Sequence, residues 1–123
     1  MHKDIIKFWF EEISQTQWWK KDAHFDQLIA SRFLEIHGQA SRCELYQWRD
    51  TAEGRLAEII VLDQFSRNIY RNSSLSFATD SLALVLAQDL LRLMQQHSYL
   101  KYNLVQIVII KLLIPENKKQ IIL

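Results

Sequence analysis

Glycine and proline are scarce in this chain, and their scarcity limits the folds that it can adopt. The 123 residues include two glycines and one proline, which is too few for the tight turns that connect β-strands in hairpins. Alanine, leucine, glutamine and glutamate are frequent, and all four favour helices. The sequence therefore predicts an all-α fold of about five helices, arranged as antiparallel helical hairpins.

The size and charge of the chain exclude several classes of protein. A chain of 123 residues forms a single domain, here residues 1–123, with a substantial core. The net charge of +1 lacks the basic excess of a nucleic-acid-binding protein. The longest apolar stretch, 104–114, is interrupted by Gln106 and Lys111 and is shorter than the ~20 residues of a membrane span. The single cysteine, Cys43, cannot form an internal disulfide, which indicates a cytoplasmic protein.

Apolar periodicity predicts four helices and leaves a fifth segment ambiguous. The segment 99–114 is rich in isoleucine and valine, so helix and strand compete there. We interpret it as a helix that ends before Pro115, because a residue before proline disfavours helical geometry. Ser76 is expected to cap the fourth helix. The four clearer helices are expected at about 3–13, 22–39, 51–69 and 77–96.

The third of these helices carries charges on the side that is expected to face the core. Counting from Leu56, Asp63 and Arg67 fall at i+7 and i+11, on the same face. An unpaired buried carboxylate is costly, so Asp63 is expected to pair with Arg67 one turn onward. Arg71 and Asp80 are expected to extend this unit. With the neighbouring amides, the candidate residues are Asp63, Gln64, Arg67, Asn68, Arg71 and Asp80.

These residues allow three interpretations. In the first, Asp63, Arg67 and Asp80 form a buried ionic network that sets how the third and fourth helices cross. In the second, Arg67 and Arg71 bind an anionic ligand, because guanidinium groups pair bidentately with carboxylate or phosphate. In the third, Asp63 is a general base. The pattern does not choose among them, so the catalytic residues are unassigned.

The histidines and the cysteine do not form a metal-binding motif. His2, His24, His37 and Cys43 lack paired spacings such as CxxC or HExxH, so neither a metal nor a cofactor is expected. His37 lies near the end of the second predicted helix, where an imidazolium cation suits the helix dipole. The aromatic residues flank the predicted helices and are expected to pack in the core: Phe8, Trp9, Phe10, Trp18, Trp19 and Trp48.

Several short motifs occur in a characteristic order. They include FWF at 8–10, WW at 18–19, GRLA at 54–57, LDQFSRNIYR at 62–71 and FATD at 77–80. Together they resemble the bacterial family called domain of unknown function 924, over about residues 4–93. The resemblance implies an all-helical fold of the tetratricopeptide-like kind, and it leaves the biochemical activity unassigned.

The resemblance also implies a later region in which a proline precedes His-Ser-Glu. Here Pro115 is followed by Glu116 and Asn117, and residues 102–114 do not match the family pattern. The tail 99–123 is therefore interpreted as atypical, through truncation, a frameshift near Leu100 or a genuine short variant.

The sequence favours a binding or interaction module whose partner is a protein or an anionic small molecule, with no nucleic acid and no membrane. One alternative is a small-molecule enzyme or sensor with an anion-binding site of aspartates and arginines. A further alternative is a truncated fragment without function.

Overall fold

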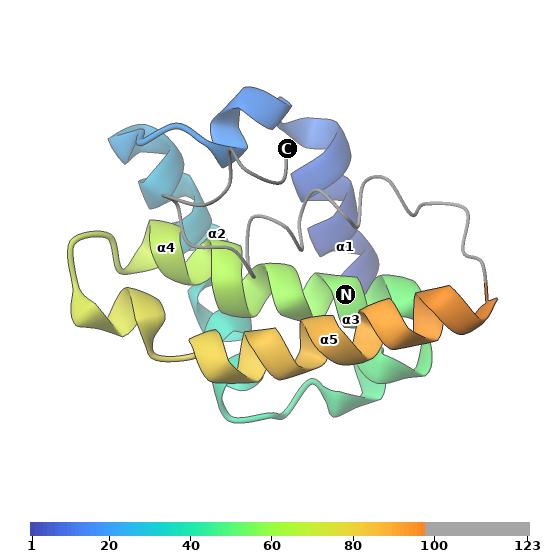
Figure 1. Cartoon of the computed structure of the whole chain (residues 1–123). Helices are drawn as coiled ribbons and strands as arrows, with labels where there is room; N and C mark the ends of the chain where they lie inside the picture. The colour runs from blue at the N-terminus through green and yellow to red at the C-terminus, as the bar shows by residue number, and fades with distance from the viewer. Residues whose placement is uncertain (98–123) are drawn as a thin grey trace, which may run out of the picture.

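The computed structural model describes residues 1–97, which fold into helices connected by short turns (Figure 1). The predicted all-α class is confirmed, and no strand occurs in this part of the chain. The predicted segment 99–114 lies outside the described residues. The α-helices are α1 (His2–Lys7), α2 (Ala23–Ser41), α3 (Ala52–Ile60), α4 (Ser66–Ile69) and α5 (Asp80–His97), with short 3₁₀ turns at Gln15–Trp18, Tyr46–Asp50 and Ser74–Phe77.

α3 and α4 are two parts of one continuous helix. The five residues between them, Val61–Phe65, form a π-helical segment, so the predicted helix over about 51–69 is present with a local widening in its middle. π-Helical segments of this kind are rare and occur frequently at functional sites. This one contains Asp63 and Gln64, two of the candidate residues. α5 packs against α3 and runs back along it in the opposite direction (Figure 1).

Side-chain caps determine where two of the helices begin. The Asp22 carboxylate accepts hydrogen bonds from the backbone N–H groups of His24 and Phe25, at 3.0 and 3.3 Å, and so caps α2. The Thr51 hydroxyl caps α3 by accepting from the N–H of Gly54 at 2.9 Å.

The predicted start of the fourth helix was wrong. α5 begins at Asp80 rather than at residue 77, because a 3₁₀ turn occupies Ser74–Phe77. Ser76 is not a cap. Its hydroxyl donates to the carbonyl of Ser73 at 2.8 Å, and the Ser73 hydroxyl accepts from the N–H of Leu75. Serine hydroxyls bond locally to backbone groups either as acceptors or as donors, so the sequence alone does not tell a capping serine from its neighbour.

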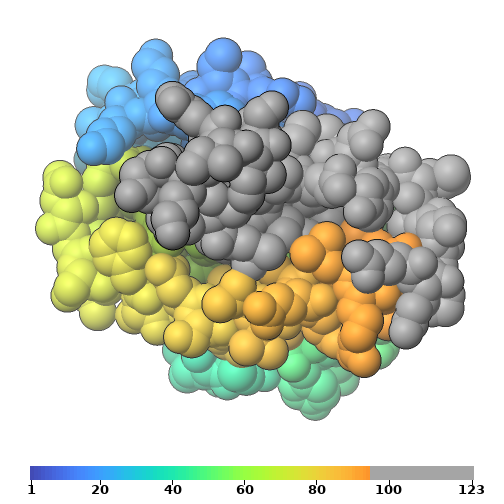
Figure 2. Space-filling model, viewed as in Figure 1, coloured from blue at the N-terminus to red at the C-terminus, as the bar shows by residue number. Residues whose placement is uncertain are grey.

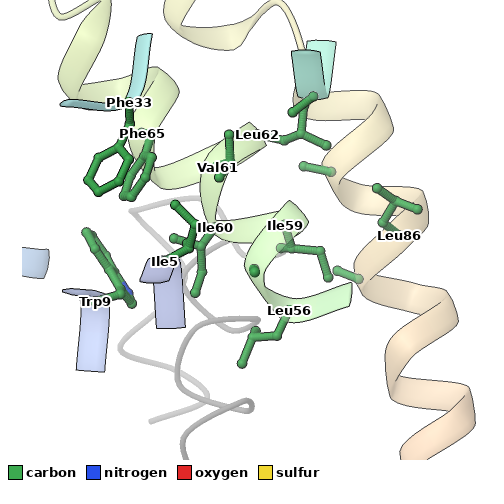
Figure 3. Close-up of a cluster of buried hydrophobic side chains, with 14 of the residues drawn as sticks. Ile5, Trp9, Phe33, Leu56, Ile59, Ile60, Val61, Leu62, Phe65 and Leu86 are labelled. Carbon is green, nitrogen blue, oxygen red and sulfur yellow. The ribbon is translucent and has the colours of Figure 1, made fainter. Parts of the chain in front are cut away.

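The central helix is buried on every side from Leu56 to Ser66. Phe65 points toward the rings of Phe33 and Trp9, while Ile59 points toward Leu86 of α5 (Figure 3). The Phe33 and Phe65 rings stack with their centroids 4.8 Å apart. Because this helix has no solvent-facing side over these eleven positions, each polar side chain on it must find its hydrogen-bond partners inside the protein.

Most of the aromatic residues pack in the core as predicted. Phe8, Trp9 and Trp18 are buried, and the indoles of Trp9 and Trp18 stack in parallel at 5.6 Å. The Trp18 indole N–H also donates to the carbonyl of Trp9 at 3.1 Å. Trp19 differs, because 49% of it is exposed.

The segment Ser74–Met94 is long and apolar enough to cross a membrane by length and composition alone. Core helices of other proteins meet the same criterion. In this fold 28% of the apolar stretch is buried. α5 packs against α3 and buries the side chains of Ala83, Leu86, Ala87, Leu90 and Met94.

Candidate functional site

The Arg67 guanidinium joins the central helix to the beginning of α5. Its Nη2 lies 3.3 Å from Oδ1 of Asp63 and 3.1 Å from Oδ2 of Asp80. Its Nη1 donates to the backbone carbonyl of Ser76. The ring of Phe77 covers one face of the guanidinium, whose carbon lies 4.5 Å from the ring centroid. The structure thus brings Asp63, Arg67 and Asp80 together, and residues 76–80 wrap around Arg67.

This cluster extends from the interior of the protein to its surface. Asp63 is 3% exposed, and the buried Gln64 amide donates to its carboxylate. The side chains of Arg67 and Asp80 are 33% and 41% exposed. Arg67 is therefore less buried than its position on the core side of the helix had predicted.

Arg71 and Asn68 form a second cluster, with Asp26 near the beginning of α2. Arg71 donates two hydrogen bonds to the Asp26 carboxylate, from Nε to Oδ2 at 2.6 Å and from Nη2 to Oδ1 at 3.0 Å. Asn68 donates to the same carboxylate at 2.8 Å. The bidentate bond to Asp26 raises the pKa of Arg71. The prediction that Arg71 extends the Asp63 unit is therefore corrected: Arg71 fastens the end of the central helix to α2.

Two hydroxyl groups converge on a backbone carbonyl inside the π-helical segment. The carbonyl of Leu62 accepts from Ser66 Oγ at 2.6 Å and from Thr79 Oγ1 at 2.7 Å. A π-helical turn disturbs the regular backbone ladder, and side-chain donors can then satisfy the carbonyls. Thr79 precedes α5 directly, so this contact fixes the beginning of α5 against the π-helical segment.

The His37 ring contacts one of these two hydroxyl groups. Its Nε2 lies 2.6 Å from Ser66 Oγ, and its ring meets the ring of Tyr70 edge to face at 5.5 Å. The residue is 5% exposed, and burial lowers the pKa of His37. The expectation of an imidazolium cation that interacts with the helix dipole is therefore wrong. Burial outweighs the dipole and favours the neutral ring.

The lowered pKa of His37 predicts a loss of stability in mild acid. The unfolded chain, with a histidine pKa of about 6.5, takes up the proton before the folded protein does. Stability from this residue is therefore complete above about pH 6.5 and falls as the pH decreases below that value. We expect the urea midpoint to decrease between about pH 7.5 and pH 5.5, and to decrease less in His37→Asn. Equal decreases in both proteins would contradict the assignment.

A buried acid that was not among the candidates lies one turn before the π-helical segment. Glu58 is fully buried, at 0% exposure. Arg49 donates two hydrogen bonds to its carboxylate, from Nε to Oε1 at 2.8 Å and from Nη2 to Oε2 at 2.7 Å. This bidentate bond raises the pKa of Arg49. The available signal was the position of Glu58 inside the apolar run 56–61, which indicates burial as clearly as the position of Asp63 does.

The charged groups on the central helix therefore act as cross-links. Arg55 adds a further one, because its Nη1 lies 2.7 Å from Oδ2 of Asp89 in α5. The guanidinium groups of Arg67 and Arg71 are directed at carboxylates of their own chain, which neutralise the charge that an anionic ligand would need.

Other features of the described residues do not add to these clusters. The outer face of α2 has an open depression, and its lining contains none of the six candidates: His24, Gln27, Leu28, Ala30 and Ser31. Residues 1–97 contain no group of three histidine, cysteine or acidic side chains arranged to hold a metal ion.

Comparison with solved structures identifies a similar fold in a protein of unknown function from Agrobacterium tumefaciens. The two chains are 33% identical and superpose with a TM-score of 0.77. The similar region covers 89% of this chain and 60% of the Agrobacterium protein, so the chain matches less than two thirds of that protein's length. A search of curated proteins found no match.

Comparison with family models matches residues 5–117 to the family described as bacterial protein of unknown function DUF924. The match extends beyond residue 93, where the resemblance in motifs ends, and includes much of the tail. It gives no support to the interpretation of that tail as truncated or altered. With most of its length matched by the family model, the chain belongs to the DUF924 family.

Proposed function

We propose that this protein is a binding or interaction module of the cytoplasm that carries out no catalysis itself. The observation that carries the proposal is that the Arg67 guanidinium is already paired with carboxylates of its own chain. Asp63 and Asp80 lie within 3.3 Å of its Nη2, and the Phe77 ring covers one face of the guanidinium. A guanidinium that is paired with carboxylates on two helices fastens those helices together, as a structural ion pair does.

The architecture and the free thiol support the finer parts of this proposal. The central helix and α5 form an antiparallel pair (Figure 1), which is the unit of tetratricopeptide-like scaffolds, and such scaffolds bind protein partners on their surfaces. Cys43 is an exposed free cysteine, which suits a reducing compartment. We therefore propose a tetratricopeptide-like scaffold with a protein partner.

One observation favours the alternative of a small-molecule sensor or enzyme. The Asp80 side chain is 41% exposed and that of Arg67 is 33% exposed, so the surface end of the cluster is open to solvent. An anionic ligand that displaces Asp80 would reach the Arg67 guanidinium. Asp63 would then remain as the inner partner of Arg67.

Substitutions at Arg67 and Asp80 separate the two functions. If the cluster is structural, Arg67→Met leaves Asp63 buried without its cationic partner, and we expect a loss of about 3 kcal/mol in the free energy of unfolding. Binding of a panel of carboxylates and phosphates, measured by calorimetry, should then be absent in both the wild type and Asp80→Asn.

If the cluster is a ligand site, the results differ in two ways. Asp80→Asn removes the competing carboxylate and should bind an anion more tightly than the wild type does. Arg67→Met should abolish that binding, because the guanidinium is the group that an anion would contact. Such a pair of results would overturn the proposed interaction module in favour of the small-molecule function.

A further inference from the structure

The connection between α4 and α5 is held to the fold by polar contacts more than by apolar burial. We name residues 73–79 the strap. It follows Asn72, whose backbone is left-handed with a φ of 67°, and it lies on the outer surface, in yellow in Figure 2. Leu75 and Phe77 are 55% and 61% exposed, and Ser76 is the buried residue of the strap. Segments with few buried apolar contacts open more easily than the rest of a fold.

The Thr79 hydroxyl is one of two anchors of the strap, and the Arg67 guanidinium is the other. Thr79 Oγ1 lies 2.7 Å from the carbonyl oxygen of Leu62 and 3.2 Å from Ser66 Oγ. Ser66 Oγ in turn lies 2.6 Å from Nε2 of His37. A row of hydrogen-bonding groups therefore connects the strap to α2.

The short distances determine where the protons of this row lie. Ser66 Oγ and the carbonyl oxygen of Leu62 are 2.6 Å apart, which requires a proton between them, and the carbonyl has none. Ser66 therefore donates to Leu62 and accepts from His37, whose Nε2 carries the proton. The other ring nitrogen, Nδ1, faces the Ser41 hydroxyl at 3.5 Å, which itself donates to the carbonyl of His37 at 2.9 Å. A neutral ring thus satisfies every bond of the row.

The surroundings of the His37 ring do not compensate a positive charge. The side chains found in contact with it among the described residues are uncharged, namely Ser66, Ser41 and Tyr70. His37 is 5% exposed, and a charge buried without a partner is costly. The charged side chains on the elements around it are exposed or paired elsewhere: Glu35 and Arg42 on α2, Asp63 in the π-helical segment, Arg67 and Arg71 in and after α4, and Asp80 in α5.

We propose that the strap is a lid that opens in mild acid, when His37 takes up a proton. A charged ring is better solvated in water, and it can reach water at the end of α2, where Ser41 is exposed. The ring then withdraws Nε2 from Ser66, and water that enters the vacated space competes with Thr79 for the carbonyl of Leu62. One of the two anchors of the strap is thereby lost.

The direction of the pH dependence follows from solvation of the ring. In the open form the ring is in water and has an ordinary pKa of about 6.5, whereas burial lowers the pKa of His37 in the closed form. The strap is therefore closed above about pH 6.5 and loosens as the pH falls below that value. Opening exposes Ser76 and removes the Phe77 ring from the Arg67 guanidinium. This inference goes beyond the proposed function and is independent of it.

Solution NMR of the full chain during a titration from about pH 7.5 to about pH 5.5 tests the lid. We expect the backbone amide signals of residues 74–80 to shift with the same midpoint as the His37 ring signal, below about pH 6.5, while that of Ile59 in α3 stays in place. In His37→Asn the neutral amide can still donate to Ser66, so the shift of the strap signals should be absent. The matched control is His24→Asn at an exposed position of α2, which should behave as the wild type does.

Thr79→Val provides a second test, because it removes the hydroxyl anchor at every pH. Its strap signals should resemble those of the wild type in acid and should no longer follow the His37 ring. Wild-type strap signals that stay in place while the ring titrates would overturn the lid, and so would a shift that persists in His37→Asn. A ring that takes up no proton above about pH 5.5 would also overturn it. So would a joint shift of Ile59 and the strap, because acid would then be unfolding the whole domain.

Discussion

Replacing Gly54 with alanine is expected to destabilise the protein strongly. A Cβ atom at this position would overlap the carbonyl oxygen of Trp48 and lie 2.8 Å from its carbonyl carbon. Both are backbone atoms, so the clash is relieved by moving the 3₁₀ turn Tyr46–Asp50 away from α3. We expect a loss of about 3 kcal/mol in the free energy of unfolding, measured by urea denaturation.

Gly38 provides a matched control in α2. A Cβ atom there lies 3.2 Å from Nη1 of Arg42, which is the end of a flexible side chain and can move. Alanine favours a helix interior over glycine by up to about 1 kcal/mol. Gly38→Ala is therefore expected to be neutral or stabilising. A similar loss in both variants would show that the contact between Gly54 and Trp48 does not limit the fold.

The helical class was predictable because it depends on local properties. Scarce glycine and proline, and apolar residues at helical spacing in α2, act within a few residues along the chain. The close approach at Gly54 was not predictable in this way. The GRLA motif marks the glycine, but the carbonyl above it belongs to Trp48 in a separate 3₁₀ turn, and nothing in the spacing of residues indicates that contact.

In the candidate site, too, the pairs between residues close in the sequence were predictable and those between distant residues were not. Asp63 and Arg67 are one helical turn apart, so their pairing followed from the geometry of the helix. Asp26 and Arg71 are 45 positions apart, and their pairing depends on how α2 packs against the central helix. The interpretation of His37 was wrong because helix dipoles are local, whereas burial depends on the whole fold.

Glu58 shows a further limit of reasoning from one helical stripe. The prediction assumed a helix with a core face and a solvent face, but residues 56–66 are buried all round. A helix in that position has no exposed side on which a charge can be solvated. Its buried acids must therefore be paired within the fold, and loss of a partner should be costly.

Replacing Arg49 with methionine tests that requirement, because it removes the guanidinium that pairs with the fully buried carboxylate of Glu58. Methionine keeps much of the side-chain volume but leaves a carboxylate in the core without its cation. We expect a loss of about 3–5 kcal/mol in the free energy of unfolding, since breaking a buried pair by removing one partner leaves an uncompensated charge. Urea denaturation at neutral pH measures it.

Two further variants show whether the loss comes from the stranded charge. In Arg49→Met with Glu58→Leu, both charges are absent, and most of the lost stability should return, because an apolar pair requires no desolvation of ions. Arg42→Met breaks the exposed pair with Glu44, whose side chains are 61% and 50% exposed, and should change stability little. If the double variant were as unstable as Arg49→Met, the Arg49 side chain would stabilise the fold through packing and not through its charge. Neutralising a buried acid would then not be the reason for the pairs Arg49–Glu58 and Arg67–Asp63.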